Sequence, residues 1–86
     1  ALDKNSLIFI TFDESGNDSS SCCGLGETAG GHVAAVLISP LAKGGFQDST
    51  PLSHYSLLKT ILLSWKLPAL GFTANSATEA ITLPWK

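Results

Sequence analysis

The chain has 86 residues, enough for one small domain, and chains of this size bury only roughly 60–65% of their unfolded surface. Hydrophobic residues make up 44% of the sequence and charged residues only 14%, whereas ordinary domains carry about 25% charged residues. The net charge of −2 argues against nucleic acid as the main partner, and no apolar stretch approaches the ~20 residues that span a bilayer. We therefore expect the apolar excess to form an interface, with a larger folded unit or with other copies of the chain.

The first expected element is a strand from Leu7 to Phe12, after a polar, exposed lead-in from Ala1 to Ser6. The lead-in has no charged and apolar leader, so we expect Ala1 to be neither part of a signal peptide nor a native start. The strand runs directly into two acids, Asp13 and Glu14. Acids at the carboxyl end of a strand lie where open α/β sheets form their sites, although acids also end strands because the chain leaves the core. Carboxylates suit Mg²⁺, Ca²⁺ or Mn²⁺, and together with histidine they suit Zn²⁺ or iron.

A loop rich in serine and glycine is expected from Asp13 to Gly31, and loops of this length tend to be functional or disordered. Cys22 and Cys23 are adjacent, so we do not expect them to bridge each other, because that ring departs from preferred disulfide geometry. One of them could pair with a cysteine elsewhere in a parent protein. Asn17 begins an N-glycosylation sequence, which has meaning only if the chain is secreted.

The second expected strand, Val33 to Ile38, is apolar on both faces, which suits a sheet covered on both sides rather than a half-exposed hairpin. His32 immediately precedes this strand and follows Gly30-Gly31, a pair that allows close backbone approach. A lone histidine is more often a loop or capping residue than a ligand, but Asp13 is expected nearby in the same fold. We keep both interpretations and treat His32 as a candidate residue near the site.

A helix is expected after the loop from Leu41 to Leu52, with Ser53 as its N-cap and Pro68 ending it. The face expected to be apolar follows helical spacing at His54, Leu57, Leu58, Ile61, Leu62 and Trp65. His54 and Tyr55 open the helix at its positive dipole end, which is a natural anion site. We favour the alternative, that His54 packs on the apolar face or caps the helix. The tail from Ala69 to Lys86 has no clean period and is expected to be irregular and partly buried.

The order strand, long loop, strand, loop, helix predicts the α/β class, as part of a sheet sandwiched between helices. Two strands and one main helix cannot cover both faces of such a sheet, so most of it would come from other sequence. We expect residues 1–86 to be a single, partial domain.

Four blocks of the sequence, taken in order, resemble the C-terminal portion of the phosphoesterase family. They are Leu-Ile-Phe-Ile-Thr-Phe-Asp-Glu-Ser-Gly, the run from Gly-Gly-His-Val-Ala-Ala to Pro-Leu-Ala-Lys-Gly-Gly, Ser-His-Tyr-Ser-Leu-Leu-Lys-Thr-Ile, and Lys-Leu-Pro-Ala-Leu-Gly. The family includes bacterial acid phosphatases and non-specific phospholipases C, within the alkaline-phosphatase-like superfamily. The resemblance implies a mixed or largely parallel sheet between helices and a secreted, periplasmic or surface location.

The resemblance also implies site roles. Asp13 would be a ligand of a divalent metal ion of unknown identity, Glu14 would lie in the same site, and His32 would lie near it. The serine or threonine nucleophile and the first metal-binding acid would belong to the missing N-terminal part. No catalytic residue is therefore assigned within this chain alone, and we expect the chain to be inactive by itself. Leu62 departs from the family pattern, where an acid is expected.

Three functions compete at this point. The first is part of a metal-dependent phosphoesterase, whose partners are the rest of that chain and a phosphate-ester substrate. The second is a structural, self-assembling chain with a β-rich fold, suggested by two apolar strands of low charge that carry no proline. The third is a module that binds phosphate-bearing ligands without hydrolysing them.

Overall fold

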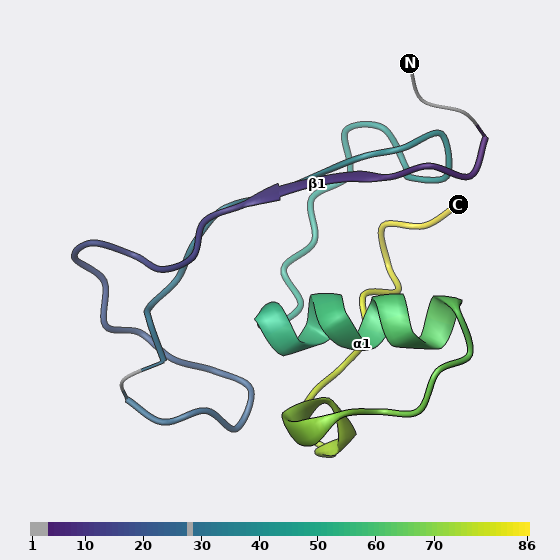
Figure 1. Ribbon diagram of the computed structural model, residues 1–86. Coiled ribbons are helices and arrows are strands. Elements are labelled where there is room, and N and C mark those ends of the chain that lie inside the picture. Colours follow the sequence, from purple (N-terminus) through teal and green to yellow (C-terminus); the bar gives the residue numbers. More distant parts are fainter. Residues whose placement is uncertain (1–3, 28) are drawn as a thin grey trace.

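The computed structural model describes residues 4–27 and 29–86, so the first half of the predicted lead-in lies outside the described residues. Its elements follow the order β1 (Ile8–Thr11), β2 (Ala35–Ile38), α1 (His54–Ser64) and the short 3₁₀ helix η1 (Gly71–Ala74). The two strands form a ribbon on one side of α1, and η1 lies on the other side of that helix (Figure 1). This is the predicted small α/β arrangement of two strands and one main helix.

The two strands pair in antiparallel orientation, with Ile8 opposite Ile38 and Thr11 opposite Ala35. Both are shorter than the sequence predicted. Just beyond the last pair, the Thr11 hydroxyl donates a hydrogen bond of 2.8 Å to the Ala34 carbonyl. The antiparallel direction places the carboxyl end of β1 beside the amino end of β2. The acids after β1 and the histidine before β2 therefore lie at the same end of the ribbon.

One face of this ribbon is open, which contradicts the expectation that both faces of the second strand would be covered. Alternate residues of a strand share a face, and the outward set is 41–52% exposed: Ile8, Ile10, Val36 and Ile38. The inward residues Phe9 and Leu37 are half-buried and line an apolar cavity of about 680 Å³ with residues of α1. The described residues therefore cover the ribbon from one side only.

The start of α1 matches the prediction, with Ser53 as its N-cap. The Ser53 amide donates to the Ser56 hydroxyl at 3.0 Å, so a side chain of the first turn satisfies the amide that precedes the helix. The hydroxyl of Ser53 itself is buried and has no hydrogen-bond partner. The Ser56 hydroxyl therefore accepts a hydrogen bond at the helix start, whereas the Ser53 hydroxyl makes none with the described residues.

The end of α1 comes before Pro68, which was predicted to stop it. Lys66 adopts a left-handed conformation with φ of 56°. The Lys66 amide then donates to the Leu63 carbonyl at 3.1 Å, and the Leu67 amide donates to the Leu62 carbonyl at 2.8 Å. This pattern is a Schellman motif, which satisfies the last carbonyls and turns the chain away.

The C-terminal segment, residues 70–86, is irregular as predicted, apart from η1. It packs on α1, where the Thr60 hydroxyl accepts the Ile81 amide at 2.9 Å. Ile81 and Leu62 are the buried hydrophobic residues among those described. This core is small for 86 residues, which agrees with the apolar excess in the sequence. Within residues 4–27 and 29–86, no helix has the length and apolarity needed to cross a membrane.

Candidate functional site

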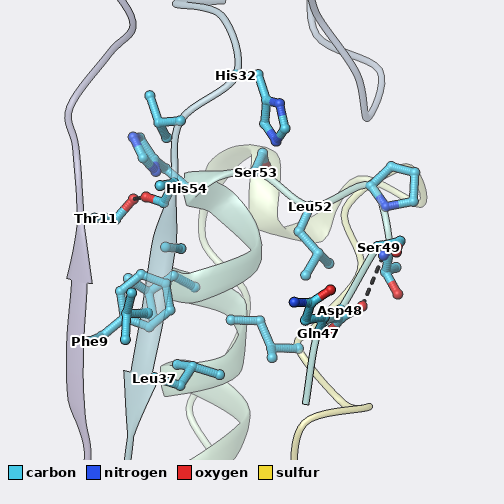
Figure 2. A pocket seen from close by; sticks show the side chains of 18 of the residues that line it. Phe9, Thr11, His32, Leu37, Gln47, Asp48, Ser49, Leu52, Ser53 and His54 are labelled. Carbon is cyan, nitrogen blue, oxygen red and sulfur yellow. Dashed lines mark hydrogen bonds between the residues drawn. The ribbon is translucent and has the colours of Figure 1, made fainter. Parts of the chain in front are cut away.

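A broad, open pocket of about 1370 Å³ lies between the end of the ribbon, the start of α1 and the loop before that helix. Its polar lining comes from segments far apart in the sequence. Figure 2 shows polar and apolar side chains that line the pocket. The side chains that can carry chemistry there include Thr11, Asp13, His32, Asp48, Ser53 and His54. Two of these, Asp13 and His32, were predicted from sequence to belong to a site.

Asp13 lies just beyond β1 and is joined to the start of α1. The ring nitrogen Nε2 of His54 lies 2.9 Å from the Asp13 carbonyl oxygen. A carbonyl oxygen can only accept, so Nε2 carries the hydrogen, and this contact does not use Nδ1. One oxygen of the Asp13 carboxylate, Oδ1, accepts the Glu14 amide at 2.8 Å. Asp13 is one of the residues that line the pocket.

Glu14 differs from its neighbour. It is exposed and is not among the residues that line the pocket. Its Cβ lies opposite Gly30, where a methyl group added to that glycine would come within 3.3 Å. The two acids therefore have different surroundings, although they are adjacent in sequence. The structure brings Asp13 to the pocket and leaves Glu14 outside it.

His32 lines the pocket and is exposed. Its backbone amide donates to Oδ2 of Asp18 at 3.0 Å. The same carboxylate accepts the hydroxyl of Ser20 at 2.7 Å and the Ser20 amide at 3.0 Å. Asp18 thus closes the loop back on itself and fixes the backbone from which the His32 ring projects.

The hydrogen bonds from the Ser20 side chain, the Ser20 backbone and the His32 backbone hold the pKa of Asp18 below its usual value of 3.8. A lowered pKa in the folded state means that this loop contact is fully present above pH 3.8 and is lost as the pH falls through the lowered value.

We expect the His32 amide to become less protected from hydrogen exchange as the protein is acidified from about pH 5 to about pH 2, because protonated Asp18 is a weaker acceptor. Amide NMR of His32 measures this directly. In an Asp18→Asn variant, which carries no titrating carboxyl, the transition should disappear. An unchanged transition in that variant would assign it to another group.

The metal expected from the family resemblance finds no complete set of ligands here. Within the part of the chain that the structure describes, no three His, Cys, Asp or Glu side chains lie close enough together to hold an ion. A divalent cation usually takes several oxygen or nitrogen ligands from the protein. Asp13 can supply one carboxylate ligand, so the described residues by themselves do not form a complete metal centre.

The expectation that Cys22 and Cys23 do not bridge each other is wrong in this structure, because they form a disulfide. Cys23 adopts a left-handed backbone conformation with φ of 66°. The described residues contain no free cysteine. Asn17 is exposed, as a glycosylated asparagine must be.

Sequence reasoning missed two residues that shape the site. His54 was expected to pack on the helix or cap it, but its ring is exposed and bonded to the acidic loop. Its position as the first residue of α1, at the positive end of the helix dipole, was a usable signal. Asp18 lies in a loop without periodicity, and nothing in the residue pattern indicates that it reaches His32 across fourteen positions.

Comparison with known proteins adds a family. Residues 2–68 match the Phosphoesterase family. The chain is also similar to an "Acid phosphatase" of Aspergillus fumigatus (strain ATCC MYA-4609 / CBS 101355 / FGSC A1100 / Af293), at 36% identity over 68 residues. The aligned part is 79% of this chain and only 14% of that phosphatase. No solved structure matches. Because the family match covers well over half of the sequence and includes both strands and α1, the chain belongs to the phosphoesterase family.

Proposed function

We propose that this chain forms one wall of the active site of a phosphoric-ester hydrolase, of the phosphomonoesterase or phospholipase C type. The observation that carries the proposal is the 2.9 Å contact between His54 and the Asp13 carbonyl, which joins the acidic loop to the start of α1 at one pocket. The acid phosphatase that resembles this chain supports the same reaction class. The substrate would be a phosphate ester bound in the polar part of the pocket.

The chain's own residues suit the handling of charge and protons. Transfer of a phosphoryl group is catalysed mainly by positioning and by stabilising charge on its oxygens. His54, with Nε2 on the Asp13 carbonyl, presents Nδ1 as a second site for a proton. His32 offers a second imidazole at the same pocket. The N-terminus of α1, with no acidic residue in its first turn, adds a partial positive charge there.

The attacking group is proposed to come from elsewhere. The Thr11 hydroxyl donates to the Ala34 carbonyl, and the Ser15 hydroxyl accepts the Asp18 amide at 2.9 Å. Both hydroxyls bond to backbone groups, and among the residues that the structure describes no general base is bonded to either. A divalent cation would likewise need ligands from other sequence in addition to Asp13. We therefore propose that the chain is inactive by itself.

An extracellular or periplasmic location is part of the proposal. The Cys22–Cys23 disulfide supports it, because disulfides persist mainly in oxidising compartments. The exposed Asn17 is a proposed glycosylation site on the same ground. Recovery of the protein only from a reducing cytosol would contradict this part of the proposal.

The test uses p-nitrophenyl phosphate. The chain alone, with Mg²⁺, Mn²⁺, Zn²⁺ or Ca²⁺ added in turn, should show no turnover above a metal-only blank. In a longer, active polypeptide that carries these residues, His54→Gln and Asp13→Asn should each lower kcat/KM by about 10²–10⁴-fold, the range for loss of a proton-handling or charge-stabilising group.

Glu14→Gln is the matched control, since it removes a neighbouring charge that does not line the pocket. It should change kcat/KM by less than about threefold, because its charge is exposed to solvent. Equal losses in the Asp13 and Glu14 variants would show that net charge of the loop, and not the pocket geometry, is responsible. Turnover by the chain alone would refute its proposed inactivity.

A second candidate, a self-assembling chain, is favoured by the open apolar face of the ribbon formed by Ile8, Ile10, Val36 and Ile38. Such a face on a two-stranded ribbon with two free edges is typical of a surface that pairs with another chain.

A further inference from the structure

The disulfide between Cys22 and Cys23 closes a tight turn, Cys22–Leu25, which we name the disulfide turn. Within it the Leu25 amide donates to the Cys22 carbonyl at 2.9 Å. Cys23 has φ of 66° and Gly24 has φ of 80°. The left-handed conformation is unfavourable for an ordinary L-residue. The covalent ring therefore holds Cys23 in a backbone conformation that it would not prefer by itself.

The disulfide turn touches the start of α1 on one side. Cys22 Sγ lies 3.5 Å from the carbonyl oxygen of Leu52, the residue before the N-cap of α1. A sulfur in a disulfide carries no hydrogen, so in the oxidised state this is a packing contact. After reduction the thiol could donate to the same carbonyl, which would keep Cys22 near its present place.

On its other side the disulfide turn is docked against the C-terminal segment through Gly24. A methyl group built on Gly24 would lie 2.8 Å from the Ala77 methyl and 3.6 Å from the Phe72 ring. The Phe72 ring in turn packs on Tyr55 of α1, with centroids 5.0 Å apart. This docking depends on the position of the Gly24 backbone, which the left-handed Cys23 sets.

The disulfide turn also belongs to the pocket wall. Cys22 and Leu25 line the pocket, together with Ser20 and Ser21 just before them. Ser20 holds the Asp18 carboxylate, which holds the amide of His32. The disulfide is therefore close in sequence to Ser20 and Asp18, whose hydrogen bonds hold the backbone of His32.

We propose that the Cys22–Cys23 disulfide is a redox-sensitive latch that fastens the long loop to the C-terminal segment. A dithiol reductant supplies two electrons and two protons: the S–S bond breaks, two thiols form, and the reductant is left as its own disulfide. Cys23 then relaxes out of the left-handed region, and Gly24 withdraws from Phe72 and Ala77. The pocket loosens on the loop side, while the β1–β2 ribbon keeps its pairing.

The experiment compares the oxidised and dithiothreitol-reduced protein by intact mass, thiol titration and hydrogen exchange. The oxidised protein should lack titratable thiols when denatured, and reduction should add the mass of two hydrogens without forming dimers. Reduction should speed amide exchange by at least about tenfold at residues 20–26 and 72–77 and leave residues 8–11 and 35–38 unchanged.

Two variants separate the redox step from the docking. Cys22→Ser/Cys23→Ser should show the fast exchange with or without reductant. Gly24→Ala, which crowds Ala77, should show fast amide exchange at residues 72–77 while Cys22 and Cys23 remain joined as a disulfide. Two free thiols in the unreduced protein, disulfides between chains, or equal exchange before and after reduction would overturn the proposal. None of these measurements requires phosphatase activity, so the latch and the proposed hydrolysis stand or fall separately.

Discussion

Replacing Gly31 with alanine should lower the free energy of unfolding by more than about 2 kcal/mol and release His32 from the pocket. Gly31 has φ of 82°, a conformation that costs an L-residue roughly 1–2 kcal/mol. A methyl group there would also overlap the carbonyl group of Asp18 and come within 2.9 Å of the Ser15 side chain. The second cost falls on backbone atoms, which cannot rotate away as the end of a flexible side chain can.

Urea denaturation and exchange of the His32 amide measure this effect. Gly16→Ala is the matched control in the same loop, since nothing lies within 4 Å of a methyl group added there. It should leave both quantities nearly unchanged. A Gly31→Ala protein as stable as the Gly16→Ala protein would show that the loop rearranges freely around residue 31.

The elements of the fold followed from local signals. The runs from Leu7 to Phe12 and from Val33 to Ile38 are strongly apolar and β-branched, and both contain the observed strands. The helical spacing after Ser53 is equally strong, and α1 begins where it predicts. Strand ends were less predictable because they depend on partners, as with the Thr11 hydroxyl that takes the Ala34 carbonyl at the end of the ladder.

The direction of pairing and the cover of the sheet could not be read from the same signals. The apolar run from Val33 to Ile38 is typical of a sheet covered on both faces. The observed ribbon leaves one face open among the described residues, because the cover of a strand depends on sequence beyond it. The left-handed Lys66 at the end of α1 was also unpredictable, since lysine rarely takes the place of glycine there.

The candidate site was predictable in part. Asp13 and His32 could be found because each adjoins a strand end, and antiparallel pairing brings those ends together. The hydrogen bonds that organise the pocket could not be predicted in the same way. Asp18 reaches His32, and His54 reaches Asp13, across fourteen and forty-one positions of sequence. Contacts of this kind arise from the folded path of a loop, which carries no periodic signal.

The chain by itself should self-associate through the open face of the ribbon, and Ile10→Lys should weaken that association by at least about tenfold. Ile10 is 52% exposed and lies opposite Val36, which is 51% exposed, at the centre of the open face. A charge placed there must be desolvated when another apolar surface covers the face, whereas it stays hydrated in the monomer. Sedimentation velocity over a range of concentrations measures the change.

The control for this prediction is Leu63→Lys, since Leu63 is 58% exposed on α1 and is not part of the ribbon. If the ribbon is the interface, the Leu63 variant associates like the original chain and the Ile10 variant does not. Equal weakening by both would assign the association to apolar surface in general, and a persistent monomer would reject self-assembly.

The same substitution also tests whether the open face packs against another copy of the chain or against the rest of a larger enzyme. In a longer phosphoesterase polypeptide that covers the ribbon with its own sequence, Ile10→Lys would disturb folding and not the association state. Suppose that Ile10→Lys destabilises the longer polypeptide and dissociates the assembly of this chain. The same apolar surface would then pack against the rest of the enzyme in the first case and against another copy of the chain in the second. This result would also explain why so apolar a sequence buries only Leu62 and Ile81 among its described hydrophobic residues.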